Sequence, residues 1–195
     1  MMRSLRRTGF GVFLSGVFSA ILLWISAGNL AYADLADDVD LLLSTKDCPV
    51  CILLGADLSG ADLSRANLKI SDLSEANLSN ANLTKADLLA ANLVSANMSG
   101  ATLEGADLSR TDLTNADLSG ANLTGANLAS AMMLGTNLSG ANLENVFWSG
   151  ADFKNVDLTN ATLTGVRLQG ADLTETILCH TTMPSGDVAN RDCPK

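Results

Sequence analysis

The sequence predicts an all-β solenoid, a polypeptide that coils through short extended segments separated by turns. The first observation is a strict five-residue period: 24 consecutive units of the form Ala-(Asp/Asn)-Leu-x-x run from residue 56 to residue 175 without an insertion or a deletion. The second is the composition of each unit, since the central residue is Leu in 20 of the 24 units and the residue two places earlier is Ala in 18. A fixed period of this kind is typical of repeat architectures.

Each unit is expected to hold one extended segment and one turn. A period of five fits neither the 3.6 residues of an α-helix nor the 2.0 of a β-strand, so neither element would bury the leucines together. A coil of short segments places Ala and Leu, two residues apart, on the inner side and turns the Asp or Asn between them outward. The fifth residue is Gly or Asn at 16 of 26 sites between Gly55 and His180. These residues tolerate the positive φ that a tight turn often needs.

The tandem units A-D-L-S-G, A-N-L-T-G and A-D-L-S-R resemble those of the pentapeptide-repeat family, over about residues 51–180. The resemblance implies a right-handed quadrilateral β-helix with four units per coil, which gives about six coils for residues 56–175. Side chains 20 residues apart would then stack. One such column is Leu58, Leu78, Met98, Leu118, Leu138, Leu158 and Leu178; another is Leu68, Leu88, Leu108, Leu128, Trp148 and Leu168.

The flanks of the repeat are expected to cover the open ends of the solenoid, which would otherwise expose apolar side chains and unpaired backbone groups. We predict an N-terminal cap over residues 34–50, the repeat β-helix over 51–178 and a C-terminal cap over 179–195. Leu35, Val39 and either Leu42 or Leu43 follow helical spacing behind acidic residues, which predicts a short capping helix. Cys51 falls in phase with the alanines, so the first coil is expected to begin there.

The four cysteines predict two disulfides. Cys48 and Cys51 precede the repeat and Cys179 and Cys193 follow it, so the length of the solenoid separates the pairs by far more than the roughly 7 Å that a disulfide allows. Local pairing follows, Cys48 with Cys51 and Cys179 with Cys193. A redox-active dithiol at Cys48-Pro-Val-Cys51 is the alternative, but the βαβ unit that such a motif normally joins is not predicted. A zinc site would need both pairs and His180 together, and the same distance excludes it.

The first 33 residues have the pattern of a signal peptide. Arg3, Arg6 and Arg7 precede an apolar stretch, and Ala31-Tyr32-Ala33 offers the small residues that a signal peptidase reads. Retention as a membrane anchor is the alternative, because the apolar run from Phe10 to Ala27 is close to the length that spans a bilayer. We therefore expect an exported protein, in the periplasm or, for a cyanobacterial source, in the thylakoid lumen. Cleavage would leave no stable membrane insertion.

The mature protein is acidic, because cleavage would move the formal net charge from −9 to −12. That charge disfavours nucleic acid. Units that depart from the consensus, together with a column of carboxylates, form a candidate interaction patch, for which a solvated face that supports the turns is the alternative. The patch consists of Phe147, Arg167, Met132, Asp72, Asp112, Asp152 and Asp172. Phe147 and Arg167 are 20 residues apart and are expected to stack as a cation–π pair.

The predicted function is a non-enzymatic structural or protein-interaction module with an unidentified protein partner, self-association being a further option. The sequence has one histidine, and no catalytic, cofactor or metal site is predicted from its motifs. The resemblance to exported pentapeptide-repeat proteins with paired cysteines implies the same role. The alternative comes from the quinolone-protection branch of the family, whose acidic rods resemble DNA and occupy DNA gyrase; export argues against that function, because gyrase is cytosolic.

Overall fold

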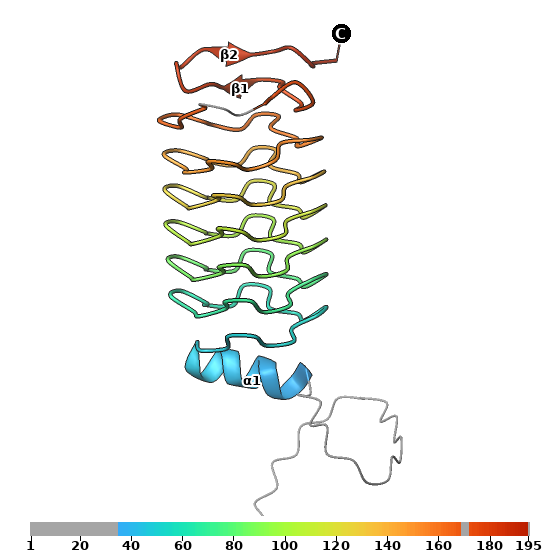
Figure 1. Cartoon of the computed structure of the whole chain (residues 1–195), viewed down its shortest axis with the longest axis vertical. Helices are drawn as coiled ribbons and strands as arrows, with labels where there is room; N and C mark the ends of the chain where they lie inside the picture. Colours follow the sequence, from blue (N-terminus) through green and yellow to red (C-terminus); the bar gives the residue numbers. More distant parts are fainter. Residues whose placement is uncertain (1–34, 169–171, 195) are drawn as a thin grey trace, which may run out of the picture. The chain divides into compact units, whose positions relative to one another are not determined.

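The computed structural model describes residues 35–168 and 172–194, and the predicted signal peptide lies outside this part. The described residues form a stack of coils between helix α1 (Leu35–Thr45) and a short antiparallel hairpin of β1 (Thr181–Thr182) and β2 (Val188–Ala189) (Figure 1). No helix among these residues has the length and apolar character to cross a membrane.

Parallel bridges between residues 20 apart join each coil to the next, from Asp47↔Asn67 to Thr162↔Thr182. The hydrogen bonds follow one pattern: the Leu53 N–H donates to the Asp72 carbonyl at 2.7 Å. The Asn77 N–H donates back to the Ala56 carbonyl at 2.8 Å. Each extended segment is so short that it contributes a single bridge. The resulting ladder therefore has the spacing that four units per coil requires.

The inner columns contain the residues that the period predicts. Leu118 is fully buried between Met98 and Leu138, and the alanines two places before the central residues are buried in most units. Ser71, Thr111 and Thr136 replace alanine in three units and are also buried. Their hydroxyls donate to backbone carbonyls, those of Leu68, Leu108 and Leu113, so these polar groups are satisfied inside the coil.

The turns adopt one conformation whatever residue stands at the fifth position. Every fifth residue from Val50 to Gly165 has a positive φ, and the turn is closed by a bond such as that from the Ala56 N–H to the Leu53 carbonyl at 3.0 Å. A positive φ at the third residue alone is the pattern of a type II turn. The coil thus imposes this conformation even on the β-branched Val50 (φ 65°) and Ile70 (φ 58°), for which it is costly.

Replacing Ile70 by Asn is expected to stabilise the fold by about 1 kcal/mol, because Asn tolerates a positive φ and Ile70 is 62% exposed. Urea unfolding measures the change. The matched reverse variant is Gly120→Ile, since an added Cβ at Gly120 (φ +65°) meets nothing within 4 Å, and it is expected to destabilise by about 1–2 kcal/mol. A loss of stability in Ile70→Asn would contradict this assignment of strain.

Helix α1 packs its inner face on the first coil and resolves the choice between two leucines. Leu42 is fully buried and Leu43 is exposed; Leu35, expected to face inward, is also exposed. The buried Asp38 carboxylate accepts the Ile52 N–H at 2.7 Å, a tie between the helix and the coil that helical spacing did not predict. The ladder begins at Asp47 rather than at Cys51, because the buried Cys48 occupies the first leucine position.

The repeat phase also runs further toward the C-terminus than expected. We predicted that it breaks at Cys179, but Thr182 still bridges Thr162. Thr181 lies fully buried at the alanine position, and its hydroxyl donates to the Leu158 carbonyl at 2.7 Å. A hydroxyl with a backbone partner can therefore replace the alanine methyl at the end of the solenoid.

Candidate interaction surface

The turns divide the solenoid into four sides, named here by their first complete segments. Side 1 contains residues 51–55, side 2 residues 56–60, side 3 residues 61–65 and side 4 residues 66–70, each with the segments that stack on it at intervals of 20. The predicted patch falls on two adjacent sides. Phe147 and Arg167 lie on side 4, and the other members lie on side 1.

The carboxylates of the patch support the turns. The Oδ1 atoms of Asp72, Asp112, Asp152 and Asp172 each accept the N–H two residues later, at 3.0–3.1 Å. Asp72 Oδ1 also accepts the Asn92 side-chain amide at 3.0 Å. The same Asx bonds occur on the other sides, for example from the Ser119 N–H to Asp117 at 2.9 Å. The acidic column is thus part of the general scaffold and does not by itself distinguish side 1.

Several carboxylates are held in their charged form by these bonds. Hydrogen bonds from Ser59, Lys46 and Thr174 lower the pKa of Asp57, Asp62 and Asp172, respectively. Near the C-terminus, the Leu178 N–H donates to Asp192 Oδ2 at 2.9 Å and lowers the pKa of Asp192. These groups favour the folded state when ionised.

Acid is therefore expected to destabilise the fold as these carboxylates protonate. A carboxylate whose pKa is lower in the folded state contributes stability above its unfolded pKa of about 3.9, and this contribution is lost as the pH falls further. Melting temperatures between about pH 5 and about pH 3 should fall less steeply in Asp192→Asn than in the parent protein. Equal slopes would show that the bond to Leu178 does not depend on the charge.

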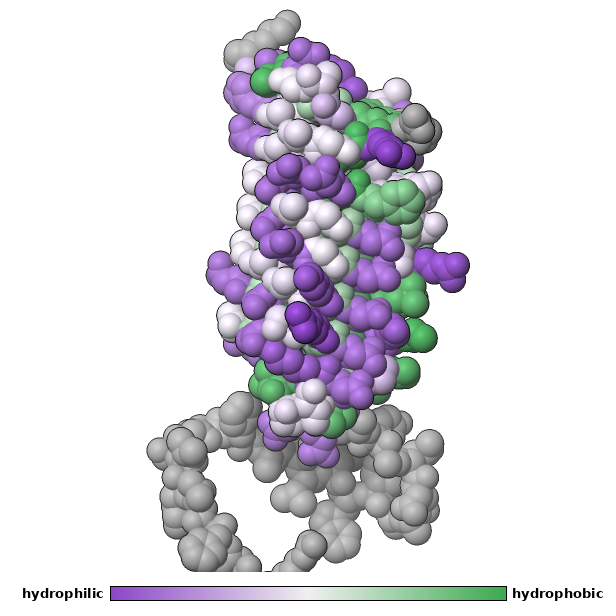
Figure 2. Space-filling model, turned by 90° about the vertical axis from the view of Figure 1, so that its left-hand side faces the viewer, coloured by the Kyte–Doolittle hydropathy of each residue, from purple (hydrophilic) through white to green (hydrophobic). Residues whose placement is uncertain are grey.

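Exposed large apolar residues distinguish sides 1 and 4 from the other two. Sides 1 and 4 carry seven of them: Ile52, Leu54, Met132 and Leu134 on side 1, and Val50, Ile70 and Phe147 on side 4. Among the described residues, side 2 carries only Ile177 and side 3 carries none. Figure 2 shows much of the hydrophobic surface along the right-hand edge of the view, beside a broad hydrophilic face. We call these seven residues the apolar surface.

The ladder opens on the same two sides near the C-terminal end. From Leu53 to Leu128, every central residue donates its N–H to the carbonyl 19 residues later. Among the described residues, this bond is absent at Met133, Trp148 and Phe153, all on sides 1 and 4, whereas Leu158 on side 2 retains its equivalent, to the Ile177 carbonyl. We call this the open ladder.

Two bulky core residues explain the open ladder. Trp148 and Phe153 take the place of leucine and pack edge to face, with ring centroids 4.7 Å apart. Both rings are larger than the leucines of the other coils, so they need space between segments that ladder bonds would hold together. The predicted stack of Arg167 on Phe147 is not formed, because these two residues do not bridge.

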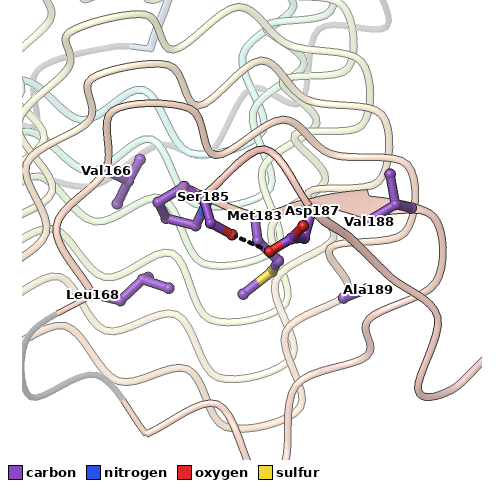
Figure 3. Close-up of a pocket in the computed structure, with 8 residues that line it drawn as sticks. Val166, Leu168, Met183, Ser185, Asp187, Val188 and Ala189 are labelled. Carbon is purple, nitrogen blue, oxygen red and sulfur yellow. Dashed lines mark hydrogen bonds between the residues drawn. The ribbon is translucent and has the colours of Figure 1, made fainter.

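A cavity of about 290 Å³ lies at the open ladder, lined by Asn145, Val146, Phe147, Trp148, Ser149, Gly165 and Arg167. A second cavity, of about 430 Å³, lies at the C-terminal end, where the hairpin departs from the coil register. Figure 3 shows Val166 and Leu168 on one wall and the hairpin residues Val188 and Ala189 on the other. The Ser185 hydroxyl donates to Asp187 at 2.9 Å at its edge.

A family model for pentapeptide repeats matches the sequence in 8 copies, over residues 51–69, 71–110, 106–145 and 149–179. The chain belongs to the pentapeptide repeat family. Its structure is similar to that of Rfr23, a pentapeptide repeat protein from the cyanobacterium Cyanothece 51142, at 30% identity and a TM-score of 0.61, over 63% of this chain and 98% of that one. The fold is accordingly a right-handed β-helix.

Two further structures are more distant in shape. A pentapeptide repeat protein of the Arabidopsis thaliana thylakoid lumen is 38% identical, over 55% of this chain and 68% of that one, with a TM-score of 0.25. QnrB1, a plasmid-mediated fluoroquinolone resistance protein, is 21% identical, over 67% of this chain and 83% of that one, with a TM-score of 0.33. A search of curated proteins finds no match to the sequence.

This pentapeptide repeat protein has a disulfide at each end of the described solenoid, with the pairing that the sequence predicts. Cys48 bonds to Cys51 and Cys179 bonds to Cys193. The buried Asp38 carboxylate lies beside the first pair and His180 beside the second, within 4.8 Å between candidate ligand atoms. The two groups remain separate, and their sulfurs are joined to each other.

The sequence analysis missed four members of the apolar surface: Val50, Ile52, Leu54 and Ile70. The signal was available for Ile52, which stands at the Asp/Asn position of a unit that precedes the first consensus alanine. Val50 and Ile70 occupy fifth positions, where an apolar β-branched residue opposes both the turn and the solvent. A comparison of each outward position with the consensus would have found all four.

Proposed function

We propose that this pentapeptide repeat protein is an exported, non-enzymatic structural and protein-interaction module, whose partner binds sides 1 and 4. One observation carries the proposal: large apolar side chains are exposed on these two sides, while the two opposite sides present the polar consensus. Contiguous apolar area on an otherwise polar surface marks interaction sites in soluble proteins.

The apolar surface costs the fold stabilising contacts, which supports a role in binding. At Ile52, Met132 and Phe147, the protein gives up the carboxylate or amide that would accept the N–H two residues later, as Asp72 does. Aromatic residues and Met are enriched in protein interfaces. We assign the surface to an unidentified protein partner, with a second copy of this protein as the other occupant, and not to nucleic acid, since the formal net charge is −9.

The proposed organisation is a signal peptide over residues 1–33, an N-terminal cap over 34–50, a repeat body over 51–178 and a C-terminal cap over 179–195. Helix α1 supports the first cap, through Leu42 in the core and Asp38 on the Ile52 N–H. Arg191 supports the second cap, because its guanidinium donates to the Leu173 carbonyl at 3.0 Å and to the Thr176 carbonyl.

Export is supported by the two disulfides, since such bonds persist in oxidising compartments. The proposed location is the periplasm, or the thylakoid lumen for a cyanobacterial source. A fusion of residues 1–40 to a reporter that is active only after export tests the location. Cytosolic retention would overturn it and return attention to the gyrase-binding alternative, which a supercoiling assay with the full-length protein then tests.

Phe147→Asp is expected to remove partner binding and leave the fold intact, because Asp is the consensus residue at this position and supplies the missing turn acceptor. Capture of cross-linked partners from the periplasm or lumen, and sedimentation for self-association, measure the effect. Asn122→Asp is the matched control, since it adds the same charge on side 3 and keeps the acceptor that now serves Thr124. Equal binding by both variants and the parent protein would contradict the assignment to sides 1 and 4.

A further inference from the structure

The cavity at the open ladder has unusual polar walls for this protein. It is lined by one guanidinium, that of Arg167, and by no acidic residue, although the protein as a whole has a net charge of −9. Arg167 is exposed and makes no ion pair or hydrogen bond with any other described residue. An arginine without a carboxylate partner, in a protein that has 21 acidic residues, is a free anion-binding group.

A second donor in the same walls also lacks an acceptor. Trp148 is 3% exposed, and its Nε1–H is the one buried side-chain N or O group of the described residues that has no hydrogen-bond partner. An indole N–H can only donate. Leaving such a donor buried and unpaired costs about 1–3 kcal/mol, so an acceptor that reached it would gain more than one that met solvated groups.

The backbone around Trp148 leaves room for that acceptor. The Trp148 N–H lacks the ladder bond to the Arg167 carbonyl, so the two segments that form the cavity are not tied together at this point. Asn145 and Ser149 add further polar groups to the walls, and the ring of Phe147, 58% exposed, stands at the same cavity. The site therefore combines donors and one positive charge with an apolar neighbour.

We infer that this cavity binds a carboxylate group, which Arg167 holds as a bidentate partner and to which the Trp148 indole donates. Planar carboxylates match the geometry of a guanidinium, and such charge-assisted bonds are stronger than neutral ones. The inference rests on the proposed function and deepens it: the partner brings an aspartate or glutamate side chain, or its own C-terminal carboxylate, to the place where Phe147 supplies apolar contact.

The indole N–H provides a direct readout. The full-length protein has two tryptophans, Trp24 and Trp148, so a proton–nitrogen correlation spectrum of the labelled protein contains two indole signals, which Trp148→Phe assigns. Acetate is expected to move the Trp148 signal in a saturable manner, and chloride at equal ionic strength is not. Arg167→Gln should weaken the apparent affinity for acetate about tenfold or more, as expected for a lost charged hydrogen bond. Lys154→Gln, a nearby cation on side 1, should leave it unchanged.

Three short peptides distinguish the sources of the carboxylate. Acetylated and amidated Gly-Glu-Gly offers only the carboxylate of a side chain, acetylated Gly-Gln-Gly with a free end offers only a C-terminal one, and acetylated, amidated Gly-Gln-Gly offers neither. Movement of the Trp148 signal by either of the first two and not by the third supports the inference and names the source. A fixed signal with acetate, equal movement with the third peptide, or equal affinity in Arg167→Gln would overturn it.

The two proposals fail in different ways. If Phe147→Asp abolishes partner binding while acetate leaves the Trp148 signal fixed, the interaction surface stands and the carboxylate site is wrong. If acetate binds but no variant on sides 1 and 4 alters partner binding, the site exists and the proposed function is wrong. Circular dichroism of Arg167→Gln controls for folding, which the exposure of Arg167 favours.

Discussion

Leu118→Asp is expected to unfold the protein. Leu118 is fully buried between Met98 and Leu138, and the variant loses about 1.5–3 kcal/mol of apolar burial. It also places a carboxyl group without a partner in the core, which costs about 2–7 kcal/mol more. The sum is comparable with the whole stability of a typical domain, about 5–15 kcal/mol. Circular dichroism during thermal unfolding measures the result.

The control for this variant comes from the column itself. Met98 already stands one coil away from Leu118, so Leu118→Met should cost less than about 1.5 kcal/mol. A soluble Leu118→Asp protein with the melting temperature of the parent protein would show that this side chain does not face the core.

Removing the C-terminal disulfide is expected to cost more than removing the N-terminal one. Cys179 and Cys193 are separated by 14 positions and Cys48 and Cys51 by 3. The chain-entropy model gives about 3 kcal/mol for the longer loop and about 2 kcal/mol for the shorter one. Paired Cys→Ala substitutions at each end, followed by urea unfolding, measure both.

The tail provides an independent tie that the experiment must separate. Arg191 and Asp192 hold the residues before Cys193 on the last coils, through the Leu173 carbonyl and the Leu178 N–H. Adding Asp192→Asn to the Cys179→Ala/Cys193→Ala variant tests whether this tie becomes more important once the disulfide is gone. An unchanged stability of the disulfide variant would mean that Arg191 and Asp192 alone fix the tail.

The five-residue period was sufficient to predict the inner columns and the spacing between coils. A residue such as Leu118 could be placed because a shift of its unit would expose every leucine that follows. The ends were harder to predict. Cys48, Thr181 and Met183 occupy repeat positions without consensus residues, and only the bridges from Asp47 and to Thr182 reveal their phase.

The candidate site was predictable in its location and not in its geometry. Departures from the consensus led to Phe147, Arg167 and Met132, which lie on the two apolar sides. The open ladder could not be predicted, because it depends on how Trp148 and Phe153 share the space of two leucines. The predicted stack of Arg167 on Phe147 assumed an unbroken ladder, and the missing bonds at Trp148 remove that assumption.

Both functional proposals require residues 20 apart to lie in one column, since this spacing brings the apolar residues together on sides 1 and 4. Thr102 and Asn122 form a parallel bridge on side 3, so a Thr102→Cys/Asn122→Cys variant should form a disulfide under mild oxidation. Thr102→Cys/Asp117→Cys and Thr102→Cys/Asn127→Cys, whose partners lie in the neighbouring columns, should not. Cross-linking of either of these pairs in place of the first would show that a coil does not contain four units, and would contradict the account.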